Sequence, residues 1–207
     1  MRILLFIIVK VIKKWWGGGI VDYFKKNYVM GCLQWHKASF NPQKLRINGM
    51  PIINIGKNAK ITIGDEVTIA SGSNNGIDTS CGSKINVKDN AKLEIGDHTG
   101  MTNVVIQCHE SVTIGSYVNI GAGTMIFDTD FHSLNWKDRY EGTDISKRKI
   151  LPVTIKDNAF IGAHSIILKG VTIGEKSIIG AGSVVARDVP DGEIWAGNPA
   201  KFIKNIP

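Results

Sequence analysis

The residues best suited to acid–base chemistry lie in a short string, D-T-D-F-H, at positions 128–132. A neutral imidazole, whose ordinary pKa is about 6.5, can take a proton from a hydroxyl group near neutral pH. Asp128 and Asp130 are close enough in sequence for one of them to hold a ring nitrogen of His132. The string therefore indicates His132 as a candidate general base, with Asp130 favoured as the acid that orients it.

The cysteines do not suggest a metal site. Cys32, Cys81 and Cys108 are an odd number and lack the spacing of zinc ligands. Such a set is typical of reduced thiols in a cytosolic protein. We therefore expect no resident metal ion and a cytoplasmic location.

The elements that must position His132 are revealed by a period of six. From residue 155 the chain divides into the units IKDNAF, IGAHSI, ILKGVT, IGEKSI, IGAGSV and VARDVP. Each unit opens with an aliphatic residue and has a small or β-branched residue in its fifth place. A period of six fits neither a helix nor a flat strand, but it fits a short extended run followed by a corner. Three units close a triangular coil of about 18 residues, and such coils stack at about 4.8 Å.

The period is interrupted once in its second half, between Ile126 and Ile155. The intervening residues are rich in charged and aromatic side chains, and we expect them to form a loop over about 127–150 that leaves a corner of the solenoid. His132 lies at the start of this loop. Looser versions of the period extend back to Ile55, so the repeat domain is predicted to cover residues 51–205.

Residues 1–50 form a separate, basic segment. They carry nine Lys and Arg against one acid, whereas residues 51–207 carry sixteen against seventeen. The near-neutral main body argues against nucleic acid as a partner. The apolar run Ile3–Val9 is too short to span a bilayer, and the lysines that follow it, without an A-x-A-like cleavage site, disfavour a signal peptide.

Residues 1–16 are predicted to be helical, because Lys10, Lys13 and Lys14 share one helical face, and Gly17–Gly19 are predicted to end that helix. Two interpretations stay open, and they are compatible. The helix lies in a membrane interface, at the inner face of the membrane, or it covers the open end of the main domain.

The repeats resemble a known family. The segments IGAGTMIFDTDFHSL (120–134), VTIKDNAFIGAHSIILKGVTIG (153–174), IIGAGSVVARDVP (178–190) and AGNPAKFI (196–203) are similar to the hexapeptide-repeat acyltransferases. The resemblance is strongest to bacterial O-acetyltransferases that modify sugars and cell-surface polysaccharides. It implies an all-β fold, a left-handed parallel β-helix, together with the short N-terminal helix and the extruded loop.

The same resemblance implies transfer of an acetyl group from acetyl-CoA to a hydroxyl of a saccharide. His132 matches the catalytic histidine of the family, and the backbone N–H of Ala163 matches the donor that stabilises the oxyanion. Asn103 is a candidate for holding the acceptor, although a structural role at a corner is an equal alternative. Because family members also orient the histidine through acids later in the loop, Glu141 and Asp144 stay open beside Asp130.

The resemblance also implies a coenzyme A site along the last coils, in a groove between subunits of a homotrimer. The matching positions are Ala163, Gly180, Ala181, Ala186, Arg187 and Lys201. Arg187 and Lys201 are expected to meet phosphate oxygens. Relatives often carry Thr-Lys where this chain has Ala186-Arg187, so the charge is kept while a hydroxyl is lost.

Three alternatives are weighed against this prediction. The first is an N-acetyltransferase that acts on an amino sugar, which sequence separates poorly from an O-acetyltransferase. The second is a non-catalytic β-helix scaffold, which predicts no coenzyme A binding. The third, a zinc hydratase of the γ-carbonic anhydrase kind, needs a close histidine pair, and no two of the five histidines lie five residues apart.

Overall fold

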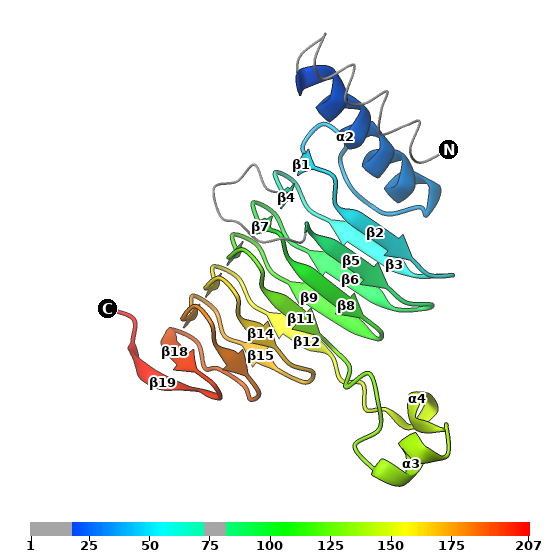
Figure 1. Ribbon diagram of the computed structural model, residues 1–207. Helices are drawn as coiled ribbons and strands as arrows, with labels where there is room; N and C mark the ends of the chain where they lie inside the picture. The colour runs from blue at the N-terminus through cyan, green and yellow to red at the C-terminus, as the bar shows by residue number, and fades with distance from the viewer. Residues whose placement is uncertain (1–17, 73–81) are drawn as a thin grey trace.

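A computed structural model describes residues 18–72 and 82–207 of the chain. These residues form a left-handed parallel β-helix, seen in Figure 1 as a stack of coils with a helix at the N-terminal end and a loop projecting from one side. The fold class that the resemblance implies is therefore confirmed, together with the extruded loop, whereas the predicted helix over residues 1–16 lies outside the described residues.

Within the described residues the strands form three sheets, one along each side of the triangular coil. The first sheet contains, in spatial order, β1 (Arg46–Gly49), β4 (Thr68–Ser71), β7 (Gly100–Thr102), β10 (Asn119–Ile120), β13 (Phe160–Ile161), β16 (Ile178–Ile179), β18 (Glu193–Gly197) and β19 (Ala200–Asn205). The second contains β17 (Val184–Val185), β14 (Ile166–Ile167), β11 (Met125–Phe127), β8 (Val105–Cys108), β5 (Lys84–Val87) and β2 (Ile52–Ile55). The third contains β15 (Thr172–Ile173), β12 (Val153–Ile155), β9 (Ser111–Ile114), β6 (Lys92–Ile95) and β3 (Lys60–Ile63). The strand pairs are parallel, except that β18 and β19 form an antiparallel hairpin at the C-terminal end.

The core consists of aliphatic ladders that the parallel register builds. In the first sheet Ile120 is paired with Ile161, and Ile161 with Ile179. The opening residues of the six units from residue 155 are all 0% exposed, namely Ile155, Ile161, Ile167, Ile173, Ile179 and Val185. The fifth-place residues are buried too, namely Ala159, Ser165, Val171, Ser177, Ser183 and Val189. Burying one such aliphatic side chain contributes about 1.5–3 kcal/mol, so the repeat itself supplies most of the stability of the fold.

Glycine in the second place of a unit has a steric cause. A Cβ on Gly121 would lie 2.5 Å from the backbone nitrogen of Ala163 in the next coil, and a Cβ on Gly162 would lie 2.4 Å from that of Ala181. Successive corners therefore stack closely only where the second residue lacks a side chain. The fourth place has a positive φ, as at His164 with φ of 58°. This histidine is thus a corner residue of the scaffold.

The N-terminal end of the β-helix is covered by α2 (Gly18–Trp35), which lies across it in Figure 1. Val29, Met30 and Leu33 of α2 are buried against the core. This helix has the end-covering role that one interpretation assigned to residues 1–16, which lie outside the described residues.

The helix predicted over residues 1–16, and with it the place where that helix ends, lie outside the described residues; Gly18 and Gly19 are the first two residues of α2. The sheets begin before residue 51, because Ile47 in β1 is already paired with Ile69 in β4.

The described cysteines, Cys32 and Cys108, are free thiols. Burial raises the pKa of Cys108 to about 12 and raises that of Cys32 as well, so both thiols stay protonated near neutral pH. Cys81 lies outside the described residues. No helix in the described part of the chain is long and apolar enough to cross a membrane.

Candidate functional site

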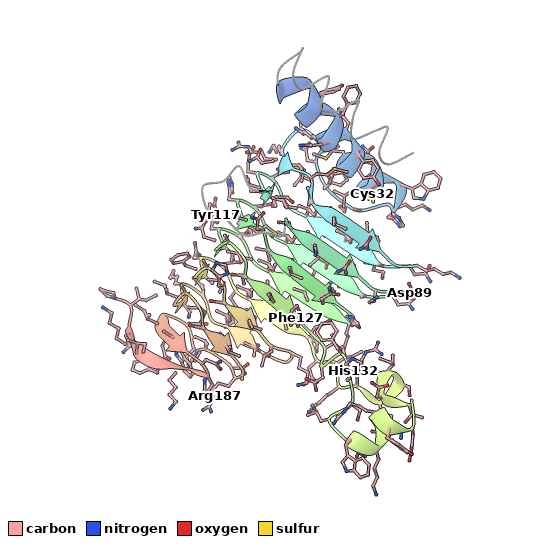
Figure 2. All side chains as sticks on the ribbon, viewed as in Figure 1. Cys32, Asp89, Tyr117, Phe127, His132 and Arg187 are labelled. Carbon is pink, nitrogen blue, oxygen red and sulfur yellow. The ribbon has the colours of Figure 1, made fainter. Side chains whose placement is uncertain are left out.

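The predicted loop leaves the solenoid after β11 and rejoins it at β12. It carries two short helices, α3 (Trp136–Tyr140) and α4 (Asp144–Lys147). Its neck is closed by a bridge between Thr129 and Ile150 and by a 2.9 Å hydrogen bond from the Leu151 N–H to the Asp128 carbonyl. Figure 2 shows Phe127 at the root of the loop and His132 farther out, clear of the coils. The neck therefore holds His132 beyond the edge of the sheets.

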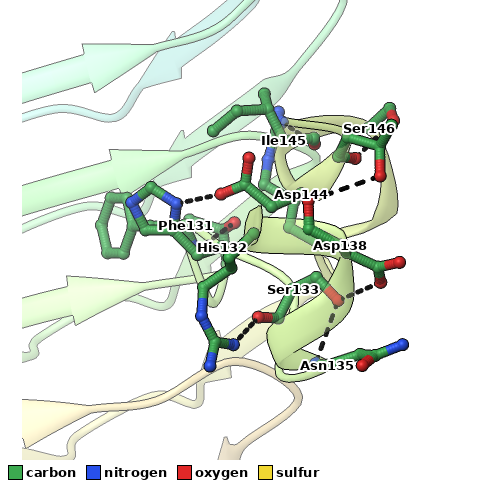
Figure 3. Close-up of polar contacts among 12 residues, drawn as sticks. Phe131, His132, Ser133, Asn135, Asp138, Asp144, Ile145 and Ser146 are labelled. Atoms are coloured by element: carbon green, nitrogen blue, oxygen red, sulfur yellow. Dashed lines mark hydrogen bonds and ion pairs between the residues drawn. The ribbon is translucent and has the colours of Figure 1, made fainter. Parts of the chain in front are cut away.

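His132 is hydrogen-bonded to Asp144 at the start of α4, as Figure 3 shows. The contact joins Nδ1 of His132 and Oδ2 of Asp144. Because an ionised carboxylate only accepts hydrogen bonds, Nδ1 carries the proton and Nε2 keeps a lone pair. The hydrogen bond from His132 holds the pKa of Asp144 below its usual value, so the acid stays charged near neutral pH. The His132 side chain is 62% exposed and that of Asp144 only 14%, which suits a supported base that meets a substrate.

Asp144 reaches His132 because the loop is folded around Asp138. The Asp138 carboxylate accepts a 2.6 Å hydrogen bond from the Ser133 hydroxyl and forms a 2.7 Å ion pair with Lys147 of α4. These two contacts hold the pKa of Asp138 below its ordinary value. Asn135 caps α3 by accepting from the Lys137 N–H at 3.1 Å. Since Ser133 adjoins the histidine and Lys147 is on the helix of Asp144, Asp138 ties the two halves of the site together.

The prediction that Asp130 orients His132 is wrong. The Asp130 carboxylate forms a 2.6 Å ion pair with Lys169 in the next coil, and both side chains are mostly buried. Asp128 is fully buried and accepts from the backbone N–H groups of residues 109–111 at 2.7–3.0 Å. Burial raises the pKa of Asp128, and those N–H groups act in the opposite direction. Both acids thus fasten the neck of the loop to the coils, and Asp144 takes the orienting role.

Asp144 is one of the two later acids that the resemblance left open beside Asp130. It stands in the first turn of α4. Glu141, the other acid left open, ends α3, and its backbone N–H bonds the Lys137 carbonyl at 2.9 Å. The structure gives Glu141 no contact with His132.

A second group of residues at the base of the loop was not found from the sequence. Arg148 donates to the Ile145 carbonyl in α4, and its guanidinium lies 3.4 Å from Nδ1 of His109. Burial, Arg148 and Lys88 together lower the pKa of His109, so this ring is neutral near neutral pH. Phe131, the neighbour of His132, packs edge-on against His109 at 5.9 Å. Arg148 therefore anchors the helix of Asp144 to the solenoid.

Asn103 makes the contacts of a buried corner residue. It is 2% exposed and has φ of 49°. Its side chain accepts from the Gly72 N–H at 2.8 Å and donates to the Gly72 carbonyl at 3.2 Å. It stands between β7 and β8, at the corner of the first and second sheets, whereas the loop leaves between the second and third. Within one chain the structure does not bring Asn103 to His132.

Three of the predicted coenzyme A residues lie together at the corner of the first and second sheets. Ala163 follows β13, and Gly180 and Ala181 follow β16 one coil later. The Ala163 carbonyl accepts from the Gly182 N–H at 2.8 Å, while the Ala163 N–H has no acceptor in the described part of the chain. This N–H is therefore available to a ligand oxygen.

The other three predicted residues are elsewhere on the last coils. Ala186 and Arg187 follow β17, at the corner from which the loop leaves two coils earlier, and Lys201 is in β19. Arg187 and Lys201 are exposed and make no ion pair with any described residue. Arg187 and Lys201 can therefore bind phosphate groups. The small side chains and the free Ala163 N–H leave room for a long thin arm of the same ligand.

The described residues contain no group of three or more His, Cys, Asp or Glu side chains placed to bind one metal ion.

Comparison with known proteins confirms the resemblance. Residues 152–187 match the family described as bacterial transferase hexapeptide (six repeats). Protein CapG of Staphylococcus aureus is 46% identical over 95 residues, which are 46% of this chain and 53% of CapG. The chain thus spans about half the length of the curated relatives that it matches.

Solved structures match over a larger part of the chain. The polySia-specific acetyltransferase NeuO has a TM-score of 0.60 and 26% identity, covering 78% of this chain and 66% of NeuO. A hexapeptide-repeat acetyltransferase of Vibrio cholerae O1 biovar eltor, in complex with acetyl-CoA, has a TM-score of 0.51 and 26% identity, covering 76% of this chain and 71% of that one.

Proposed function

We propose that this hexapeptide-repeat protein is an acetyl-CoA-dependent O-acetyltransferase that acts on a hydroxyl of a saccharide. The observation that carries the proposal is the His132–Asp144 pair, held out from the coils on a fold shared with acetyltransferases. The Vibrio cholerae relative is bound to acetyl-CoA, which supports the donor. The polySia specificity of NeuO supports a saccharide as the acceptor class.

In this proposal His132 is the general base. Its Nε2 accepts the proton of the acceptor hydroxyl as the oxygen attacks the acetyl carbonyl, because Asp144 keeps the proton of the ring on Nδ1. The charged Asp144 then stabilises the imidazolium that forms. When the carbon–sulfur bond breaks, the same Nε2 returns the proton to the thiolate. The new ester bond and the free thiol balance the reaction without a covalent enzyme intermediate.

The donor side of the site is formed by the corner of Ala163. Its free N–H is suited to donate a hydrogen bond to the oxyanion of the tetrahedral intermediate. Arg187 and Lys201 would hold phosphate oxygens of coenzyme A, and Ala181 and Ala186 leave room beside the backbone for its arm. Acetyl-CoA supplies an activated thioester, so the residues of the chain only need to position it and move the proton.

A complete site needs more than one chain, and we propose a homotrimer. Ala163 lies at the corner of the first and second sheets, while the loop of His132 leaves the corner of the second and third. The second sheet separates them within one chain. A neighbouring chain that packs along this face would bring its Ala163 corner to the loop, and a three-sided prism packs naturally about a threefold axis.

The test begins with acetyl-CoA binding measured by calorimetry on the wild type and on His132→Ala. Both should bind near one site per chain, because His132 acts on the acceptor proton. Thiol release is then followed with galactosides, glucosides and glucosamine as acceptors. His132→Ala should lower turnover at least about 100-fold while the trimer persists. An unchanged turnover would contradict the role of His132.

Product chemistry separates the remaining alternatives. Hydroxylamine cleaves an O-acetyl ester but leaves an N-acetyl amide intact, so a resistant product would show an amino-sugar N-acetyltransferase. Absence of acetyl-CoA binding to either protein would favour the non-catalytic scaffold.

A further inference from the structure

The corner that carries Ala163 also carries a histidine whose side chain the coil does not need. At the corner of the first and second sheets, three successive coils read Gly-Ala-Gly-Thr (121–124), Gly-Ala-His-Ser (162–165) and Gly-Ala-Gly-Ser (180–183). The fourth place of the unit has a positive φ each time, of 74° at Gly123, 58° at His164 and 71° at Gly182. Glycine adopts this backbone without strain, whereas histidine adopts it at a cost. Glycine would therefore form the corner at position 164 at least as well.

The imidazole of His164 is exposed and uncommitted. The backbone is held by the coil, because the His164 N–H donates to the Ala122 carbonyl at 2.8 Å. The ring makes no hydrogen bond, ion pair or ring contact with any residue that the structure describes. On the side of the next coil, a Cβ on Gly182 would meet no atom of those residues within 4 Å. The imidazole is thus available to a ligand that lies on this corner.

The corner itself offers one backbone donor to such a ligand, the N–H of Ala163. The N–H of Gly162 donates to the Ile179 carbonyl at 2.7 Å, and that of His164 is engaged by the coil. Ser165 is fully buried, and its hydroxyl donates to the Gly162 carbonyl at 2.8 Å. Each preorganised donor to an oxyanion is worth about 100- to 1,000-fold in rate. A second donor at the surface of this corner then has to be a side chain.

His164 is the side chain in the right place. Consecutive Cα atoms are about 3.8 Å apart, so the imidazole begins one peptide unit from the N–H of Ala163. An imidazole has at least one ring N–H whether it is neutral or protonated. Neutral imidazoles polarise substrate carbonyl groups in this way in other enzymes. The small side chains of the same corner, Ala181 and Gly182, leave room for a thioester beside the ring.

We propose that the imidazole of His164 is a second hydrogen-bond donor to the oxyanion of the transferred acetyl group. The inference rests on the proposed acetyl transfer and adds a catalytic residue to it. As the acceptor oxygen bonds to the carbonyl carbon, the electron pair of the C=O bond moves to the carbonyl oxygen, which accepts from Ala163 and His164. When the C=O bond forms again, the C–S bond breaks and its electron pair leaves with sulfur. The sulfur receives the proton that His132 took from the acceptor, so His164 transfers none.

Glycine, the residue of both neighbouring coils, is the matched substitution for the test. His164→Gly removes the imidazole and suits the positive φ, so the fold should persist. Calorimetry should show acetyl-CoA affinity within about twofold of the wild type, because the oxyanion exists only after attack. Turnover should fall about 100-fold, measured as thiol release with saccharide acceptors and with water as the acceptor. His164→Asn, whose amide keeps an N–H donor and tolerates a positive φ, should recover about tenfold of that loss.

His98 provides the control. It is a corner histidine with φ of 57°, between β6 and β7, and its ring stacks on that of Tyr117 at 4.6 Å. His98→Gly should keep the wild-type turnover. If His164→Gly also keeps it, or loses only acetyl-CoA affinity, the inference is overturned while acetyl transfer stands. If the wild type binds no acetyl-CoA, the proposed function falls and this inference falls with it.

Discussion

Replacing Asp144 by asparagine tests the central assignment of the site. The change keeps the size of the side chain but removes the charge beside Nδ1 of His132. The asparagine amide can also donate to Nδ1, which would favour the tautomer with the proton on Nε2 and remove the lone pair that the acceptor proton needs. The perturbation therefore acts on the protonation of His132 and leaves the coenzyme A residues untouched.

The size of the effect follows from the exposure of the pair. General-base catalysis supplies about 100- to 10,000-fold of an enzymatic rate. His132 is 62% exposed, so water can partly replace the lost carboxylate and part of the base activity remains. We expect turnover to fall about 30-fold, while acetyl-CoA affinity stays unchanged.

The assay is the pH profile of thiol release from acetyl-CoA in the presence of a saccharide acceptor. The pKa of Asp144 is below its usual value, so the wild-type carboxylate is charged throughout the working range and stabilises the imidazolium. Removing it should lower turnover across this range, because the imidazolium that forms in the reaction then lacks its counter-charge.

Two other variants decide between a direct and an indirect role. Glu141→Gln, in the same loop, should leave both rate and profile unchanged. Asp130→Asn, which breaks the pair with Lys169, should lower turnover less than Asp144→Asn does, because it only loosens the loop. If Asp130→Asn lowers turnover and Asp144→Asn does not, the assignment of Asp144 is refuted.

Gly162→Ala should lower the free energy of unfolding by about 2 kcal/mol, because its Cβ would meet the backbone of the next coil. The control is Gly100→Ala, whose Cβ meets nothing nearer than 3.7 Å and which should change the free energy of unfolding by less than about 1 kcal/mol. Equal effects of the two variants in urea unfolding would contradict the explanation that glycine lets successive corners stack closely. The contacts that lower the pKa of Asp138 stabilise the loop fully when the pH is above 3.8, the ordinary pKa of an aspartate. This stabilisation is lost as the pH falls through the lower pKa that Asp138 has in the folded protein. The protection of loop amides against hydrogen exchange should fall in this pH range in the wild type and not in Asp138→Asn. Arg187→Ala and Lys201→Ala should each weaken acetyl-CoA binding about tenfold and reduce its salt dependence; calorimetry that shows no change would remove those residues from the site.

The sequence alone determined the scaffold and the place where the site begins. A period of six repeats one set of local contacts in every coil, so the opening aliphatic residues and the small fifth-place residues identify the core without any long-range information. An interruption of that period has to leave the coil at a corner, which located the loop and His132. These features follow from short-range geometry, and for that reason they were predictable.

Only the tertiary structure decided which side chains meet. Asp130 is two residues from His132 but faces Lys169 in the next coil, while Asp144, twelve residues away, is brought back by the contacts of Asp138. Loop conformation depends on such specific side-chain bonds, which no repeat pattern encodes. The separation of the His132 and Ala163 corners and the exposure of His164 likewise depend on how the coils stack, and a linear sequence does not show that.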